Sequence, residues 1–543
     1  MNKKRILACT EASYLSSGYA RYANALLKYL HSTGEFEIME FAAWGDNNDP
    51  RSHSIPWQFY GNLPDRNNQE EVNAYNSNPY NKFGAFRFEE ACLRFRPSHI
   101  LGFRDAWHDQ HELTSPFRNF YNLIWMPAVD AIPQKEEWLS WYKQCDAVLT
   151  YTEWAKEVLD NVSSNTINTV GTATPVCDTI FKPVNNKDEH KKFMGFDSNM
   201  KIVGTVMRNQ KRKCFPKLFE AFEKYVTKNN LTDTYLYCHT SYPDDGWDIP
   251  HLLKNNNVAH KIIFTYICKN CGNCFPSFFR DGKTICPKCM SNSAGLPNTY
   301  VAVNNDVLSA IFNVFDVYVQ YSHLEGLGMP AVEAAACGVP ILSVNYSAMT
   351  EVCNNLCGKL INVKDYAVEM ESNRLWAIPD NDHLVSLLEQ HFAKTKEERN
   401  IMGMLARQNF EIHYNSWERV GRKWYDVINS TNNPKLDWNS PPQILTQKSQ
   451  INQNCSDTEF VRWLITDVLC EPDKLGTFFE SRLIRDLCFG SSNYGTGGLY
   501  YNEESCEIAD VRTVPFDRNK AYEHCTQLRE RKNHWERMRV ANV

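Results

Sequence analysis

The sequence lacks three features that would each indicate a different class of protein. No apolar run approaches the roughly 20 residues needed to span a bilayer, so we expect no transmembrane helix. There is no excess of basic residues: 58 Lys and Arg stand against 64 Asp and Glu, a formal net charge of −6, which argues against a broadly cationic nucleic-acid binder but not against a local basic patch. The first residues, MNKKRILACTEASY, lose their apolar character at Thr10 and Glu11, so they predict a β-strand rather than a secretion signal.

Cysteine, in contrast, is abundant. Nineteen cysteines without a secretion signal predict a reducing compartment, with thiols free or bound to metal, and we expect a cytoplasmic protein. The segment CKNCGNCFPSFFRDGKTICPKC contains two C-x2-C pairs, formed by Cys268 with Cys271 and by Cys286 with Cys289. Four thiolates in tetrahedral geometry are typical of a structural Zn²⁺ site, so we predict a zinc ribbon over residues 266–292 that leaves Cys274 outside.

Two series of alternating strands and helices predict an α/β chain. Short apolar runs predict the strands, which we expect at 5–9, 36–44, 99–103, 121–126, 147–151, 201–207, 234–239, 261–267 and 314–320. Amphipathic segments predict the helices, which we expect at 19–30, 88–95, 138–144, 154–159, 215–226, 306–312, 382–393, 396–412, 416–429 and 519–539. This alternation implies parallel sheets covered by helices on both faces. Polar composition predicts a long loop or an insertion at 45–82 and linkers at 184–200 and 431–455.

The most informative stretch is SHLEGLGMPAVEAAACGVP, which begins at Ser322 and ends at Pro340. Two carboxylates, Glu325 and Glu333, flank a glycine-rich loop that follows a strand and precedes a helix. Such a loop offers free backbone N–H groups and the positive end of a helix dipole to an anion. Glu333 stands about one turn into the helix, within reach of a ligand's hydroxyl groups. The stretch therefore predicts a nucleotide-sugar site.

This stretch and its neighbours resemble the retaining nucleotide-sugar glycosyltransferases of family 4, which have the GT-B fold. The family hallmark EGxGxPxxEAxAxGxP stands here as EGLGMPAVEAAACGVP. VGTVMRNQKRK resembles the family's Gly-Arg-x4-Lys segment, with Met207 in place of the glycine and with Arg208 and Lys213 at the two basic positions. YTEWAKEVL, PVCDTIFKP and NSWERVGRKWYDVI resemble further family segments in the same order, and the resemblance covers about residues 1–430.

The resemblance implies an α/β fold of two Rossmann-like lobes that face a cleft. The expected divisions are an N-terminal acceptor lobe at 1–184, a C-terminal nucleotide-sugar lobe at 185–415 with the zinc ribbon inserted at 266–292, a helix crossing back to the first lobe at 416–430, a linker at 431–455, and a C-terminal extension of unknown role at 456–543.

The resemblance also implies roles for individual residues. Glu333 would bind both ribose hydroxyls of the donor, for which UDP is the expected nucleotide, and Glu325 would contact the donor sugar. Arg208 and Lys213 would neutralise the diphosphate as the sugar–phosphate bond breaks. Backbone amides would assist them, namely those of Gly326, Leu327, Gly328 and Met329. Gly18 would let the first loop approach the phosphate closely.

The acceptor side departs from the family pattern. Many relatives have a histidine after the middle strand of the first lobe, but here the segment reads IWMPAVDAIP, with Asp130 as the nearest polar candidate. His108 and Asp105, which follow the preceding strand, are alternatives.

The expected enzyme is a retaining hexosyl- or pentosyltransferase, and three alternatives remain open. The acceptor hydroxyl could belong to a modified DNA base, which the ribbon, the basic cluster at 208–213 and the Arg-rich C-terminal helix favour and the negative net charge disfavours; such a base would have to be flipped out of the duplex. It could instead belong to a glycan or a lipid-linked acceptor. A catalytically inactive nucleotide- or nucleic-acid-binding protein would have lost Glu333 or the basic pair, and both are present.

Overall fold

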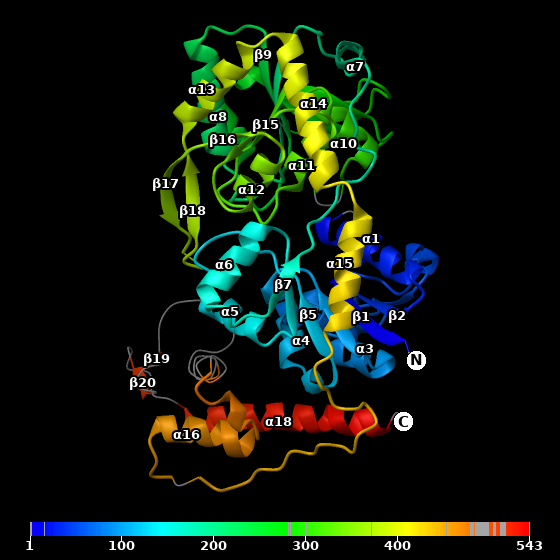
Figure 1. Ribbon diagram of the computed structural model, residues 1–543, viewed down its shortest axis with the longest axis vertical. Coiled ribbons are helices and arrows are strands. Elements are labelled where there is room, and N and C mark those ends of the chain that lie inside the picture. The colour runs from blue at the N-terminus through cyan, green and yellow to red at the C-terminus, as the bar shows by residue number, and fades with distance from the viewer. Residues whose placement is uncertain are drawn as a thin grey trace.

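The computed structural model describes residues 3–541 except 16, 281, 283, 299–300, 371, 452, 478–479, 481–482, 484–498, 503–506 and 511–516. Two α/β lobes are stacked along the long axis of the molecule, with the C-terminal extension beneath the N-terminal lobe (Figure 1). Among the described helices, none combines the length and apolar character needed to cross a membrane.

The N-terminal lobe (N-lobe) is built on a seven-stranded parallel sheet. Its strands, in spatial order, are β3 (Gln58–Gly61), β2 (Phe36–Ala43), β1 (Lys4–Glu11), β4 (His99–Gly102), β5 (Asn122–Trp125), β6 (Ala147–Thr150) and β7 (Thr169–Thr172). Its helices are α1 (Gly18–Ser32), α2 (Gln69–Asn76), α3 (Phe88–Phe95), α4 (Ala106–Thr114), α5 (Glu136–Lys143) and α6 (Glu153–Ser163), with 3-10 turns at η1 (Pro50–Ser54), η2 (Pro79–Phe83) and η3 (Arg118–Phe120). The central strands are buried on both faces, as the uninterrupted apolar run of β1 predicts.

The prediction of a long loop at 45–82 is wrong, because this segment contains η1, β3, α2 and η2. Three of its asparagines and aspartates are helix caps: the side chains of Asp49, Asn68 and Asn78 accept hydrogen bonds from the first N–H groups of η1, α2 and η2. The polar composition that indicates a loop here marks the starts of short helices.

The C-terminal lobe (C-lobe) contains a nine-stranded sheet. Its spatial order is β12 (Thr284–Ile285), β13 (Asn292–Gly295), β10 (Ile262–Cys268), β9 (Thr234–His239), β8 (Lys201–Val206), β14 (Val317–Gln320), β15 (Ile341–Val344) and β16 (Lys359–Ile361), with β11 (Cys274–Phe278) also paired to β10. Strands β8, β9, β10, β14, β15 and β16 pair in parallel, whereas β11 and β13 run antiparallel to β10.

Helices cover this second sheet, and a hairpin extends from it toward the N-lobe (Figure 1). The helices are α7 (Lys187–Phe193), α8 (Phe215–Lys228), α9 (Ile249–Lys254), α10 (Asn305–Phe312), α11 (Met329–Ala336), α12 (Ala348–Asn355), α13 (Asn381–Phe392) and α14 (Lys396–His413), with a 3-10 turn η4 (Ala259–Lys261); the hairpin is β17 (Val363–Val368) with β18 (Leu375–Pro379). The predicted linker at 184–200 instead includes α7, whose buried Lys191 binds Asp316 at 2.8 Å and ties this segment to the C-lobe.

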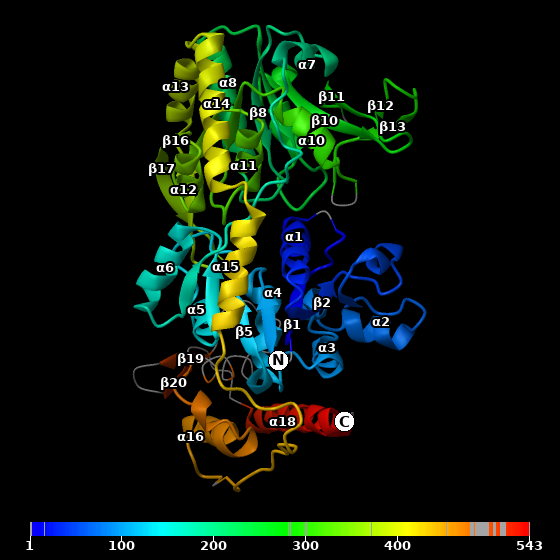
Figure 2. The ribbon, with the colours of Figure 1, turned by 45° about the vertical axis from the view of Figure 1, so that its right-hand side comes forward.

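The chain returns to the N-lobe through α15 (Trp417–Ser430), which packs along α1 (Figure 2). Trp424 of α15 is fully buried and donates from its indole N–H to the Tyr22 hydroxyl at 2.7 Å. Gly421 faces the ring of Tyr29, where a Cβ atom would lie 2.3 Å from ring carbons. A side chain at this position would therefore push the two helices apart.

The extension beyond α15 is fastened to the N-lobe. Residues 431–440 lie along it without helix or strand, and Trp438 donates from its indole N–H to the Pro97 carbonyl at 3.0 Å. The described elements that follow are α16 (Asp457–Trp463), η5 (Leu464–Val468), η6 (Pro472–Lys474), β19 (Leu499–Asn502), β20 (Glu507–Asp510) and α18 (Arg518–Ala541).

Helix α18 uses its basic residues for internal contacts. Arg539 is fully buried and donates to the carbonyls of Trp438 at 2.6 Å and Ser440 at 2.9 Å. Arg531 pairs with the buried Glu89 of α3 at 2.5 Å. One face of this helix is therefore buried, whereas most residues on its other face are exposed.

Candidate active site

The two lobes meet at loops that follow their parallel strands. Asp130, after β5, accepts a hydrogen bond at 2.7 Å from Arg374, which precedes β18. Glu351 of α12 accepts from the Trp154 N–H at the start of α6 at 2.7 Å. Loops after the carboxyl ends of strands are where sheets of this kind place ligands.

The loop between β14 and α11 lies at this junction. Gly328 is the N-cap of α11 with φ of 87°, in the left-handed region that favours glycine, and Pro330 occupies the first turn. The N–H groups of residues 326–329 make no hydrogen bond to the described part of the chain. Together with the helix dipole they form a site suited to an anion.

Glu325 is buried in this loop and surrounded by donors. It pairs with Arg212 at 2.5 Å and with Lys213, and it accepts from the Ser322 hydroxyl at 2.7 Å and the Gln320 amide at 2.9 Å. Burial alone would raise the pKa of this carboxyl, but the two cations and the hydrogen bonds outweigh it and hold the pKa at about 2. Glu325 is therefore a carboxylate across the physiological pH range.

Lys213 titrates closer to neutrality than an ordinary lysine. Burial and the charge of Arg212 lower its pKa to about 8, against the opposing attraction of Glu325. Most of the Lys213 population is cationic at pH 7, and both cations beside Glu325 carry charge there.

The structure brings Lys213 to Glu325, but it holds Arg208 elsewhere. Arg208 makes two hydrogen bonds of 2.8 Å to Asp244, and its side chain is 47% exposed. Arg212, which the sequence analysis did not single out, contacts Glu325 instead. The basic residues at 208–213 can be recognised in the sequence, but the turn that decides which of their side chains reaches Glu325 cannot.

Glu333 is buried in α11 and faces the N-lobe. Arg21 of α1 donates to it at 3.4 Å. Burial raises the pKa of Glu333, and Arg21 opposes that rise. Arg21 was missed by the sequence analysis, although it lies three residues after Gly18 on the same helix face. Gly18 is the first residue of α1, and a Cβ atom there would meet nothing within 4 Å.

On the N-lobe side, Asp105 and Asp130 lie near the same junction. Asp105 accepts from the Tyr19 hydroxyl at 3.1 Å, and burial together with the Asp130 charge raises its pKa to about 6. Both aspartates act electrostatically on Arg212 of the C-lobe. These carboxylates therefore lie opposite the cations that hold Glu325.

His108 lies behind this junction. Its ring stacks on Phe83 with centroids 4.2 Å apart, and its Nδ1 is 4.0 Å from the Asp105 carboxylate. Burial and the charge of Arg104 lower the pKa of His108 to about 2, so its imidazole is neutral at pH 7. Its role toward an acceptor, like those of the other predicted site residues, stays a prediction.

The four cysteines of the two C-x2-C pairs come together in a separate cluster. The sulfur atoms of Cys268, Cys271, Cys286 and Cys289 all lie within 4.8 Å of one another. Hydrogen bonds from Ser291 and Ser293 lower the pKa of Cys268 to about 5, which favours the thiolate that a metal binds. Cys274 lies outside the cluster. This module projects from one edge of the C-lobe (Figure 2).

Comparisons with known proteins bear on this segment and on the fold. A family model described as "Glycosyl transferases group 1" matches residues 286–373, which include both Glu325 and Glu333. No curated protein matches the chain.

Three solved structures are similar over 79% of this chain. Sucrose-phosphate synthase from Thermosynechococcus elongatus is 15% identical with a TM-score of 0.56 and 98% of its own chain covered. A glycosyltransferase from Rickettsia africae is 15% identical with a TM-score of 0.54 and 99% covered. Anabaena HepE, in complex with UDP and glucose, is 11% identical with a TM-score of 0.53 and 100% covered. At these identities the likeness shows the fold: the chain has the GT-B architecture of two α/β lobes.

Proposed function

We propose that this chain is a retaining glycosyltransferase that moves a sugar from a nucleoside-diphosphate sugar to an acceptor hydroxyl. The observation that carries the proposal is the pair of buried carboxylates, Glu325 and Glu333, where the two lobes meet. They lie on either side of four backbone N–H groups that have no partner among the described residues. The group 1 family match over this segment supports the transferase activity, and the UDP-bound neighbours support UDP as the nucleotide.

In this proposal the C-lobe binds the donor. Glu333 accepts hydrogen bonds from both ribose hydroxyls, an arrangement strengthened by its charge. The N–H groups of residues 326–329 and the cation of Lys213 bind the diphosphate. Arg212 lies beside Lys213 and adds to the positive field, and Arg208 would have to leave Asp244 to reach the same anion.

The chemical step is a substitution at the anomeric carbon. The bond from that carbon to the diphosphate oxygen breaks, and a bond to the acceptor oxygen forms on the same face of the sugar. The acceptor proton passes to the leaving diphosphate oxygen, so no second carboxylate is needed as nucleophile. Lys213, Arg212 and the backbone N–H groups stabilise the charge that develops on the leaving diphosphate, which is usually the largest contribution to catalysis.

The acceptor reaches the anomeric carbon from the N-lobe side in this scheme. Asp105 and Asp130 are the candidates to orient its hydroxyl, because both lie opposite Arg212. A hydroxyl on a DNA base stays a prediction. Two of the α18 arginines do not support it, because Arg531 is engaged with the N-lobe and Arg539 with residues 438–441.

We also infer that the four-cysteine cluster binds one structural Zn²⁺. Tetrahedral ligation with Zn–S bonds of about 2.3 Å places sulfurs about 3.8 Å apart. The distances from Cys268 to Cys289, 3.5 Å, and from Cys271 to Cys286, 3.7 Å, fit that requirement. Its place at the end of β10 supports a role in holding this edge of the sheet and no role in the transfer itself.

Turnover of a panel of UDP-sugars, measured as UDP release with the purified chain, tests the proposal. Glu333→Ala should lose roughly tenfold or more in apparent donor affinity, because a charge-assisted hydrogen bond contributes about 1.5–3 kcal/mol. Glu397→Ala, at an exposed position of the same lobe, is the matched control. Unchanged donor affinity in Glu333→Ala would exclude this assignment. The anomeric configuration of the product, read by NMR coupling constants, tests retention.

A further inference from the structure

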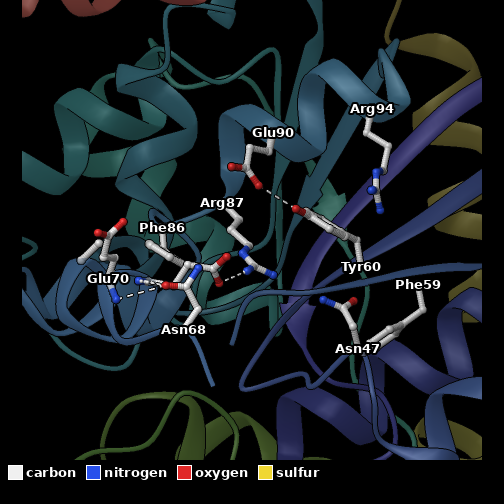
Figure 3. A pocket seen from close by; sticks show the side chains of 11 residues that line it. Asn47, Phe59, Tyr60, Asn68, Glu70, Phe86, Arg87, Glu90 and Arg94 are labelled. Atoms are coloured by element: carbon white, nitrogen blue, oxygen red, sulfur yellow. Dashed lines mark hydrogen bonds and ion pairs between the residues drawn. The ribbon is translucent and has the colours of Figure 1, made fainter. Parts of the chain in front are cut away.

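A pocket of about 790 Å³ lies in the N-lobe, away from the residues that the proposed donor site uses (Figure 3). It is formed by side chains of β3, α2 and α3 and of the segments next to them, within residues 47–94. Its volume falls in the range of about 300–1,000 Å³ that is typical of small-molecule sites.

Aromatic rings form part of the pocket wall. Tyr60 is held in place by the hydrogen bond from its hydroxyl to Glu90 at 2.7 Å and by the guanidinium of Arg94, 4.6 Å from its ring centroid. Phe59 and Phe86 also line the pocket. The half-buried rings of Phe59 and Phe86 offer apolar faces against which the C–H groups of a sugar ring can pack, whereas the Tyr60 ring is buried beside Phe41 and Arg94.

The polar side chains of the pocket divide into strict acceptors and strict donors. Glu70, Glu71 and Glu90 only accept when ionised, whereas Arg87 and Arg94 only donate. Arg87 pairs with Glu71, but Arg94 and Glu70 make no ion pair with the described residues, so both have capacity for a ligand. Figure 3 shows Arg87 at the centre of the pocket, with Arg94 directed toward Tyr60.

This combination selects among ligand classes. A hydroxyl group both donates and accepts, so vicinal hydroxyls can satisfy carboxylates and guanidinium groups at the same time. A phosphate or nucleotide would meet three carboxylates against two arginines, and an apolar ligand would leave the charges of Glu70 and Arg94 without partners. The lining therefore fits a neutral, polyhydroxylated ligand with a flat apolar face, which is the chemistry of a pyranose.

The sheet topology connects the pocket to the proposed reaction centre. Asn47, which lines the pocket, follows the carboxyl end of β2, and β1 and β4 end at the same edge of the sheet, before Gly18 and Asp105 respectively. Strand β3 lies two strand spacings, about 10 Å, from β1. A ligand of several sugar units held in the pocket can therefore extend along this edge toward Asp105.

We propose that this pocket binds a neutral pyranose saccharide, as the distal part of a glycan acceptor; the acceptor assignment rests on the proposed function, whereas saccharide binding does not. The pocket would thus determine the acceptor class, while the hydroxyl that reacts lies at the junction of the lobes.

The inference is tested by measuring how the purified full chain binds an array of neutral hexose and N-acetylhexosamine oligosaccharides. Calorimetry then measures the affinity for the oligosaccharide that binds most tightly. Glu70→Ala and Arg94→Ala, both at exposed positions that leave the core intact, should each weaken binding roughly tenfold or more. Glu333→Ala should bind the saccharide as tightly as the wild type.

The outcomes separate the two proposals. Saccharide binding that both pocket variants weaken, without change in UDP-sugar hydrolysis, supports the pocket. The pocket proposal is overturned if the chain binds no saccharide of the array, or if Glu70→Ala and Arg94→Ala bind the saccharide as tightly as the wild type. If the chain still turns over UDP-sugars in either case, the transferase proposal stands. Saccharide binding through the pocket without turnover of any UDP-sugar supports the pocket and counts against the transferase.

Discussion

Replacing Glu325 by glutamine removes the carboxylate that lies between Arg212 and Lys213 while keeping the shape of the side chain. The buried Lys213 and the Arg212 side chain, which is 34% exposed, then lie close together without their anion. A fall in pKa from 4.5 to about 2 corresponds to about 3 kcal/mol of stabilisation at pH 7. Loss of one partner from a buried ion pair costs about 3–5 kcal/mol in other proteins, which agrees with this magnitude.

The stabilisation should also depend on pH in a defined direction. Because the pKa of Glu325 in the folded protein lies below its ordinary value, the contribution is fully present above about pH 5. It is lost as the pH falls toward the folded-state pKa of about 2. The difference in unfolding free energy between wild type and Glu325→Gln should therefore narrow as the solution is acidified from pH 7.

Urea unfolding followed by tryptophan fluorescence measures this difference at pH 7 and at pH values below 5. Glu397→Gln, an exposed carboxylate of the same lobe, controls for the loss of one charge. Adding Lys213→Met to Glu325→Gln should restore part of the lost stability, because it removes one of the unpaired cations. A variant as stable as the wild type at pH 7, or a difference that stays constant on acidification, would refute the reasoning.

Three further predictions concern the cysteine cluster, helix α18 and Lys213. Metal analysis should find about one zinc per chain. The zinc should be lost in Cys286→Ser and kept in Cys274→Ser, because the sulfur of Cys286 belongs to the cluster and that of Cys274 does not. Equal zinc content in both variants would contradict this prediction. Arg531→Met leaves the Glu89 carboxylate buried without its cation and should lower the unfolding free energy by about 1–3 kcal/mol, which urea unfolding would detect. UDP affinity should weaken as the pH rises through about 8, because Lys213 loses its charge there; a flat calorimetric profile from pH 7 to 9 would count against its contact with the diphosphate.

Most regular elements could be predicted from the sequence because apolar periodicity determines them. Helix α3 has the predicted limits, 88–95, and its buried residues recur at helical spacing. Two of the elements that were missed, β7 and β17, carry no such pattern: β7 reads TVGT and is half-buried, and β17 reads VKDYAV and is mostly exposed. Their strand conformation follows from pairing with neighbours, which local composition does not encode.

The candidate site likewise contains residues that could be predicted from the sequence and residues that could not. Glu325 and Glu333 could be predicted because they lie on one continuous segment, where spacing along a loop and a helix fixes their relation. Arg21 could not, because its contact with Glu333 depends on how the two lobes meet. Arg212 and Arg208 lie in one basic cluster, and only the turn between β8 and α8 decides which of them reaches Glu325.

The contacts between the lobes bear on how a donor would enter. Arg21 reaches Glu333 at 3.4 Å, at the long end of the hydrogen-bond range, so it holds this carboxylate weakly. Asp130 and Arg374 meet at 2.7 Å, and the Leu375 N–H donates to the Ile132 carbonyl at 2.9 Å. On the proposed function, ribose hydroxyls could replace Arg21 at Glu333 while these shorter contacts keep the lobes together. The N-lobe side of the junction, with Asp105 and Asp130, would then already face the donor sugar when the nucleotide binds.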